Sequence, residues 1–394
     1  MIGTPRRHVR LRAAMRDASL PVLACALVAT MSLVGAAPAT IDVADPSKLS
    51  AGTGTIYLAS YAKRLVAIDE TTEKVVAEVS LKTGLAWTMR LSHDATRFYV
   101  QSADQEHFEV VDISTRQTVD AFTLGSAGVH VRVLAFDVDP QNRFLVAVAR
   151  TARKRTDRFE IDDPMFIQYD LKAHTIARSI PWTTDPEPRY YFLDLRFSPD
   201  GRVLYVFADK IHIYDATSLA RVDSWDLSLP TESGLGRFDL GSMDETNDEP
   251  GFFTALFTTS DPIQHRRQLV VGRVDLSQKR IDSFPVGPAP DYPEVSFALG
   301  GDRKFGYVLL QDVRRYEFWT LDLAGKRLQS RVKFDSRPRM AFRSSSNGKI
   351  IYIFEAGNTI DLYQAAGFKY LRTITLNGDM MYNTFHVVPP RPPR

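Results

Sequence analysis

The stretch SPDGRVLYVFADKIHIYD, residues 198–215, sets the pattern for most of this chain. Its opening Ser-Pro-Asp-Gly is a tight turn, because Pro199 presets φ and Gly201 tolerates positive φ. The β-branched and aromatic run 203–207 suits a strand buried on both faces, and the run after it ends in Asp215. The stretch therefore predicts two paired strands followed by a turn that an aspartate begins.

The same pattern returns at intervals of 42 to 60 residues. Periods of about 50 residues with four strands each are typical of propeller blades. The strand-ending residues are Asp69, Asp112, Asp170, Asp215, Asp275, Asp322 and, in the last repeat, Gln364. We interpret these aspartates as turn caps, one per blade, and not as a carboxylate cluster that a ring would keep apart.

The two ends of the repeat array predict how the ring closes. Residues 55–58 align with second strands, so the first repeat lacks a first strand, and residues 382–388 align with first strands elsewhere. The expected fold is all-β, a seven-bladed β-propeller over 54–388 whose C-terminal strand completes the first blade. Residues 40–53 form a lead-in, and 389–394 form a disordered Pro/Arg tail.

Residues 1–39 have the pattern of a signal peptide. Five arginines precede the apolar segment 20–37, and Ala37-Pro38-Ala39 is a cleavage site of the small-x-small type. This predicts export to the periplasm or secretion, and no membrane span after cleavage. Cleavage also removes Cys25, the only cysteine, and changes the net charge from +2 to −2. The alternative is an uncleaved anchor, because an apolar run of this length could just span a bilayer.

Composition and motifs exclude several classes of function. The near-zero net charge gives no indication of nucleic-acid binding. A mature chain without cysteine has no disulfide framework, no Cys-based zinc site and no haem-attachment motif. No histidine spacing typical of metal sites occurs, and no nucleophile elbow, P-loop or dinucleotide loop is present. The sequence therefore predicts no catalytic, metal or cofactor-binding residues on this chain.

The candidate partner-docking face is basic. In a four-stranded blade, the connections from second to third strand lie on one face of the ring, and the insertion 151–164 in blade three lengthens one of them. Such residues could bind an acidic partner or an anionic ligand, although a charged loop can also be simply solvated. The residues predicted for this face are Arg150, Arg153, Lys154, Arg155, His265, Arg266, Arg267, Arg314 and Arg315.

The repeats, as in residues 108–115 and 202–206, resemble the YVTN type of seven-bladed propeller. Within that superfamily the chain looks most like the β-subunit of quinohemoprotein amine dehydrogenase, and more distantly like the methylamine dehydrogenase heavy chain. The resemblance covers about residues 54–388, and its particular points are 159–164, 210–215 and the long fifth blade. It implies a non-redox scaffold subunit, with the quinone on a small partner subunit and the haems on another chain.

Two other functions stay open at this level. The first is a stand-alone periplasmic or secreted propeller that binds a protein, peptide or glycan. The second is a lactonase-like hydrolase that uses acidic and His residues around the central channel. Whether the chain is an enzyme is therefore left undecided by the sequence.

Overall fold

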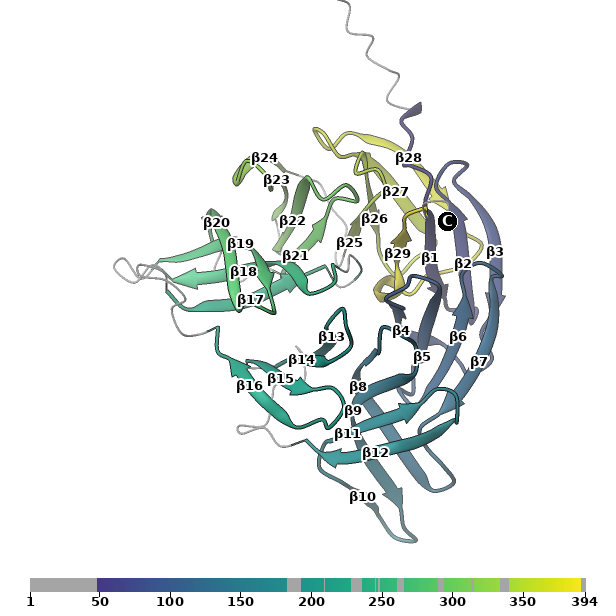
Figure 1. The fold of residues 1–394 in the computed structure, drawn as a ribbon. Coiled ribbons are helices and arrows are strands. Elements are labelled where there is room, and N and C mark those ends of the chain that lie inside the picture. Colours follow the sequence, from purple (N-terminus) through teal and green to yellow (C-terminus); the bar gives the residue numbers. More distant parts are fainter. Residues whose placement is uncertain are drawn as a thin grey trace, which may run out of the picture. The chain divides into compact units, whose positions relative to one another are not determined.

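The computed structural model describes residues 48–182, 193–208, 210–227, 236–244, 246, 249–260, 266–289, 294–312, 315–333 and 340–390. The predicted signal peptide, residues 1–39, lies outside this range. Within it the strands form seven antiparallel sheets that follow one another around a ring (Figure 1). The fold is the predicted all-β, seven-bladed propeller. No helix among the described residues has the length and apolar character needed to cross a membrane.

The strands of each blade lie in chain order from the ring centre outward, except in blade one, where the C-terminal strand is innermost. Blades one to three contain β29 (His386–Val388), β1 (Thr55–Ser60), β2 (Arg64–Asp69) and β3 (Lys74–Ser80); β4 (Ala86–Leu91), β5 (Arg97–Ser102), β6 (His107–Asp112) and β7 (Gln117–Thr123); and β8 (Val129–Val138), β9 (Phe144–Lys154), β11 (Met165–Asp170) and β12 (Thr175–Pro181), with the additional β10 (Phe159–Ile161).

The other four blades have four strands each. They contain β13 (Asp194–Phe197), β14 (Val203–Phe207), β15 (Ile211–Asp215) and β16 (Arg221–Trp225); β17 (Phe238–Met243), β18 (Phe252–Ser260), β19 (Arg267–Asp275) and β20 (Arg280–Pro288); β21 (Glu294–Leu299), β22 (Phe305–Asp312), β23 (Arg315–Asp322) and β24 (Arg327–Lys333); and β25 (Ala341–Ser344), β26 (Ile350–Phe354), β27 (Thr359–Gln364) and β28 (Tyr370–Thr375).

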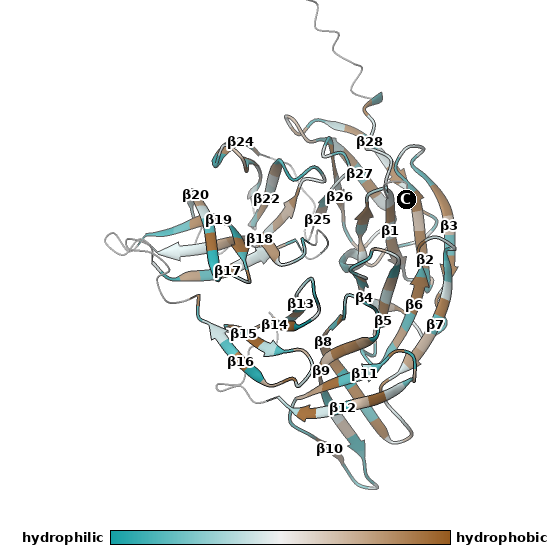
Figure 2. Ribbon diagram, viewed as in Figure 1, coloured by the Kyte–Doolittle hydropathy of each residue, from teal (hydrophilic) through white to brown (hydrophobic). Residues whose placement is uncertain are grey.

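The core is divided among the blade interfaces. Buried residues of the described chain form seven hydrophobic clusters, each shared by two neighbouring blades. Every residue of β26 is buried, whereas β3 and β24 are largely exposed. Figure 2 shows the contrast between the hydrophobic β8 and the more hydrophilic outer strand β16. Each buried large side chain contributes about 1.5–3 kcal/mol, so stacking of blades holds this cysteine-free fold together.

The aspartates at the strand ends cap turns, as predicted. The Asp112 carboxylate accepts hydrogen bonds from the Ser114 hydroxyl at 2.6 Å and the Thr115 amide at 2.8 Å. The Ser114 and Thr115 bonds lower the pKa of Asp112 to about 2. Equivalent bonds are accepted by Asp69, Asp170, Asp215, Asp275 and Asp322. Four residues after each of these aspartates the chain has a positive φ, as at Arg116, which makes the turn the same in each blade.

The C-terminal strand closes the ring, although it is shorter than predicted. Of the predicted residues 382–388, only β29 forms a strand, which pairs with β1 from Val388 opposite Thr55 to His386 opposite Tyr57, whereas Tyr382–Thr384 forms the 3-10 helix η3. The Thr384 hydroxyl accepts a hydrogen bond from the Ala59 amide at 2.8 Å and so replaces a strand bond there. The lead-in is also fastened to blade seven, because Arg372 donates to the Leu49 carbonyl at 2.9 Å.

Candidate functional site

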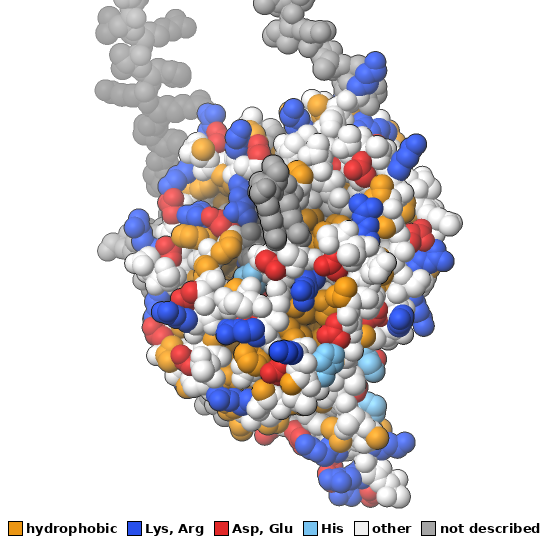
Figure 3. All heavy atoms as spheres, turned by 45° about the vertical axis from the view of Figure 1, so that its right-hand side comes forward, with side chains coloured by type: hydrophobic (Ala, Val, Ile, Leu, Met, Phe, Trp, Pro, Cys, Tyr) orange, Lys and Arg blue, Asp and Glu red, His pale blue; other side chains and the backbone are white. Residues whose placement is uncertain are grey.

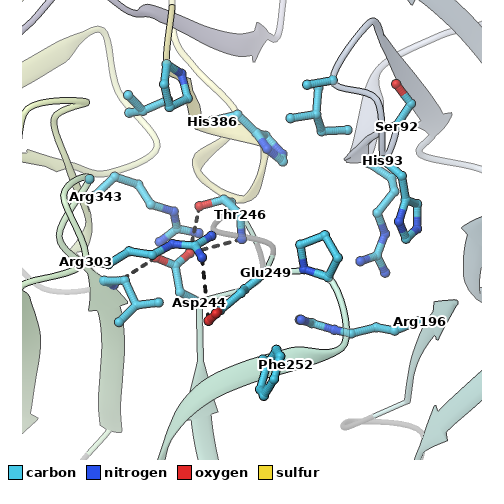
Figure 4. A pocket seen from close by; sticks show the side chains of 18 of the residues that line it. Ser92, His93, Arg196, Asp244, Thr246, Glu249, Phe252, Arg303, Arg343 and His386 are labelled. Atoms are coloured by element: carbon cyan, nitrogen blue, oxygen red, sulfur yellow. Dashed lines mark hydrogen bonds and ion pairs between the residues drawn. The ribbon is translucent and has the colours of Figure 1, made fainter. Parts of the chain in front are cut away.

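A cavity of about 260 Å³ lies where the inner strands converge. On β13 the side chains alternate, so that Leu195 packs between blades while Asp194 and Arg196 face the centre. The cavity wall includes Arg90 of β4, Arg343 of β25 and His386 of β29. Figure 4 shows Arg343 and His386 there. A second cavity of about 170 Å³ shares these three residues. We call the two together the channel cavity.

The channel cavity lies largely at the turns between first and second strands, on the face opposite the long second-to-third connections. The sequence predicted docking residues on that other face and gave no indication of this cavity. In the structure, the β17–β18 connection supplies Asp244, Thr246 and Glu249 to the cavity wall. The inner strands gave no signal of their own in the sequence, because a channel-facing polar residue looks like any exposed residue of a strand.

Two buried carboxylates in the channel join neighbouring blades. Asp137 of β8 accepts a hydrogen bond from the Phe197 amide of β13 at 2.8 Å. Asp244, which follows β17, accepts one from the Leu299 amide of β21 at 3.0 Å. Both carboxylates thereby satisfy backbone donors that would otherwise be buried without a partner. We assign Asp137 a structural role in joining blade three to blade four, and Asp244 a structural role in joining blade five to blade six.

A fork of two arginines on one carboxylate crosses the channel wall. Asp194 accepts from Arg90 Nη2 at 2.5 Å and from Arg196 Nε at 3.0 Å. Arg90 also donates to the Phe136 carbonyl at 3.3 Å, so it links blade two to blades three and four. Burial opposes ionisation of Asp194, but the two guanidiniums outweigh it and lower its pKa. The fork is therefore a cluster of ionised groups, in which the negative charge of Asp194 and the positive charges of the two arginines stabilise one another.

Glu249 compensates two further arginines at the cavity edge. Its Oε1 lies 2.5 Å from Arg273 Nη2, and its Oε2 lies 3.6 Å from Arg303 Nη1. Arg273 also stacks over the ring of Phe252, with 3.9 Å between its Cζ and the ring centroid. These two ion pairs hold the Glu249 carboxylate at the rim of the cavity.

Arg343 and His386, in contrast, retain unsatisfied polar atoms. Arg343 Nη1 donates to the Phe342 carbonyl at 2.8 Å, and no described carboxylate forms an ion pair with its guanidinium. Arg343 Nε and His386 Nδ1 are buried atoms with no hydrogen-bond partner in the described part of the chain. Figure 4 shows both side chains at the channel cavity. Buried polar atoms without partners are uncommon and mark places where a ligand can bind.

The environment of His386 keeps the imidazole neutral. Its side chain is 5% exposed and packs edge-on against Phe98, with ring centroids 5.2 Å apart. Burial, aided by the nearby charge of Arg343, lowers the pKa of His386 to about 3, against a hydrogen bond to the Met89 backbone. At neutral pH the ring therefore carries one proton and one free lone pair.

The described residues contain no group of three or more His, Cys, Asp or Glu placed to hold a metal ion. The channel does gather the acidic and His residues that the hydrolase alternative requires. His93 Nε2 lies 3.5 Å from Asp137 Oδ2, but that same oxygen accepts the Phe197 amide. The arrangement thus offers binding groups more readily than a free general base.

The predicted docking residues of blade three lie on a projecting hairpin. The insertion lengthens β9, and β10 pairs antiparallel with its end, from Phe159 opposite Lys154 to Ile161 opposite Ala152. We call residues 150–161 the blade-three extension; it projects at the bottom of Figures 1 and 3. Arg153 pairs with Asp162, and Arg155 Nε lies 2.8 Å from Glu160 Oε2. These acidic residues therefore neutralise much of the positive charge of the basic residues in the hairpin.

The blade-three extension also carries exposed apolar side chains that sequence reasoning missed. Phe159 is 61% exposed and Ile161 is 68% exposed. They are two residues apart on β10 and so share one face. The signal in the sequence was the alternation Phe-Glu-Ile inside an insertion, where no core is available to bury it.

The other predicted docking residues belong to blades five and six. Arg266 and Arg267 are exposed at the β18–β19 connection. Arg315 begins β23 at the β22–β23 connection, and its side chain lies outside the described residues. His265 and Arg314 lie outside them as well. These positions share the second-to-third strand connection with the blade-three extension, and their role in docking stays a prediction.

No protein-family model and no curated protein matches this chain. Among solved structures, a functionally unknown protein from Desulfotomaculum acetoxidans DSM 771 is 11% identical with a TM-score of 0.51, over 86% of this chain and 100% of that one. At this identity the likeness shows the fold alone. It agrees with the class that the strands define, a seven-bladed β-propeller.

Two further structures are similar at lower TM-scores. Kuenenia stuttgartiensis hydrazine synthase is 16% identical, with a TM-score of 0.48 over 81% of this chain and 94% of that one. Dihydro-heme d1 dehydrogenase NirN in complex with DHE is 14% identical, with a TM-score of 0.45 over 86% and 76%. The resemblance to the amine dehydrogenase β-subunit is not tested by these comparisons and stays a prediction.

Proposed function

We propose that this chain is a non-redox docking subunit of a periplasmic amine dehydrogenase complex, and that the blade-three extension binds a protein partner. The observation that carries the proposal is the exposure of Phe159 and Ile161 on a projecting strand. Exposed large apolar side chains grouped on one face are typical of interaction sites. In this proposal the quinone and haem cofactors belong to partner subunits, and the leader 1–39 directs export.

The shape of the extension favours contact with a folded partner. β10 lies at the end of the strand order β10-β9-β11-β12, so its outer backbone edge is unpaired among the described strands. Exposed edges and aromatic anchors are what partners use in strand addition and in interface hot spots. The exposed Lys154 beside them would steer an acidic partner surface toward the hairpin.

A pull-down from the native host tests this proposal. The bait is the full chain with Phe159→Ser and Ile161→Ser, compared with wild type and with Val222→Ser, which changes a 62% exposed valine on β16. We expect wild type and the control to retain a haem-bearing chain and a small quinone-bearing chain, identified by haem absorbance and mass spectrometry. The double variant should retain at least roughly tenfold less, because hot-spot truncations each cost about 2 kcal/mol or more.

Two outcomes would contradict the proposal. If wild type recovers no haem-bearing chain, the amine dehydrogenase assignment is wrong. If the double variant recovers the chains as well as wild type does, the extension is not the docking surface. The channel cavity favours the second candidate function, a stand-alone periplasmic or secreted propeller that binds a protein, peptide or glycan, because it offers a site for a glycan. That function predicts binding by the isolated chain.

A further inference from the structure

Two side chains that line the channel cavity have polar atoms whose hydrogen-bonding capacity is unused. They are the Arg343 guanidinium on β25 and the His386 imidazole on β29, whose Nε and Nδ1 atoms have no partner among the described residues. Both residues line both parts of the cavity, and Figure 4 shows them on adjacent walls.

One ring nitrogen of His386, Nδ1, is buried and has no hydrogen-bond partner among the described residues. In a neutral imidazole each ring nitrogen either carries the N–H and donates or has a lone pair and accepts. A hydroxyl group can satisfy either state, because it both donates and accepts hydrogen bonds.

Arg343 is a charged donor, and its natural partner is a ligand group that accepts hydrogen bonds and carries a negative charge. The other channel arginines are compensated: Arg90 and Arg196 by Asp194, and Arg303 by Glu249. Arg343 has no such carboxylate among the described residues, and one of its nitrogens bonds only to the neighbouring Phe342 carbonyl. A guanidinium in a partly desolvated cavity binds carboxylates strongly and often through two nitrogens.

We propose that the channel cavity binds a small hydroxylated carboxylate, such as a sugar acid, with its carboxylate on Arg343 and a hydroxyl on His386. A cavity of about 260 Å³ holds a ligand of several carbons, which is larger than an inorganic anion. Nδ1 is shielded from solvent in the present arrangement. Binding therefore includes a turn of the imidazole about its Cβ–Cγ bond, a torsion with broad minima. This inference does not rest on the docking proposal.

Calorimetric titration of the full chain with four probes tests the chemistry directly. D-Gluconate has both groups, hexanoate lacks the hydroxyls, sorbitol lacks the carboxylate, and inorganic phosphate is a compact anion. We expect gluconate to bind at least roughly tenfold more tightly than the other three, because a charge-assisted hydrogen bond contributes about 1.5–3 kcal/mol. Equal binding of hexanoate would overturn the hydroxyl assignment, and equal binding of sorbitol or phosphate would overturn the carboxylate assignment.

Variants then test the two residues. Arg343→Gln should weaken gluconate binding roughly 10- to 100-fold, and His386→Phe roughly 3- to 10-fold while leaving hexanoate unaffected. The control is Arg202→Gln, which changes an 85% exposed side chain on the β13–β14 turn. Because His386 belongs to the closing strand, each variant is first compared with wild type by circular dichroism. Unchanged gluconate affinity in Arg343→Gln, or no gluconate binding by wild type, would overturn the proposal; the four-probe series stands even if His386→Phe fails to fold.

Discussion

Replacing Glu70 by alanine should lower the free energy of unfolding by roughly 3–5 kcal/mol at pH 7, because three donors lose their acceptor. Glu70 is 1% exposed and joins the first blade to the last. It accepts from the Gly54 amide at 3.0 Å, the Ser346 amide at 3.1 Å and the Tyr352 hydroxyl at 2.8 Å. Guanidinium chloride unfolding, followed by tryptophan fluorescence, measures the loss.

The control for this prediction is Glu78→Ala, which removes a half-exposed carboxylate paired with Arg64. Surface pairs of this kind contribute at most about 1 kcal/mol. Burial raises the pKa of Glu70 above its unfolded value of 4.5, against hydrogen bonds from Ser346, Tyr352 and Gly54. The contribution of Glu70 is therefore largest below that value and declines as pH rises, so the variant should lose more at pH 4 than at pH 7. A loss no larger than that of the control would show that Glu70 does not hold the ring closed.

Changing Asp194 to asparagine should lower the free energy of unfolding by roughly 2–4 kcal/mol, because Arg90 and Arg196 then lose their shared carboxylate. Arg196 is only 6% exposed, so loss of the shared carboxylate leaves its charge largely buried. Asn has the size of Asp194 and keeps one acceptor oxygen, so the decrease in the free energy of unfolding measures the effect of removing the negative charge. The measurement is the same denaturant titration.

The loss of stability in Asp194→Asn depends on pH in the opposite direction to the loss in Glu70→Ala. The Asp194 pKa is lowered by the two guanidiniums despite burial. Its stabilisation is therefore present above its unfolded value of 3.8 and is lost as pH falls, so wild type and Asp194→Asn should converge toward pH 3. Asp239→Asn, at a half-exposed carboxylate on β17 paired with Arg237, is the control and should change little. Equal losses in the two variants would show that the fork is not a stabilising cluster.

The fold was predictable because its signals are local and repeated. Six of the seven blades have the same Asp-capped turn, and turns such as residues 198–201 require positive φ at a fixed position, which Gly201 adopts at 71°. Closure was predictable from the unmatched strands at the two ends. The extent of the closing strand was not, because Thr384 substitutes a side-chain hydroxyl for a strand bond, and that depends on the position of Ala59, 325 residues away.

The channel could not be predicted in the same way. Arg90 and Asp194 are 104 residues apart and meet only because the ring brings β4 and β13 to one centre. Nothing in the sequence separates Arg343, which has no ion-paired carboxylate among the described residues, from the surface arginines. The basic run of blade three was visible, but its ion pairs and the exposure of Phe159 depend on the register of β10 against β9.

The strand that closes the ring is also the strand that carries His386 into the channel. If β29 separates from β1 when the ring opens, the strand pairing and one of the two proposed ligand-binding side chains are lost together. A ligand in the channel would therefore stabilise the closed ring, because it binds only the closed form. At a concentration of 100 times its Kd it would stabilise closure by about 2.7 kcal/mol. The ring would then open least readily where its ligand is most abundant.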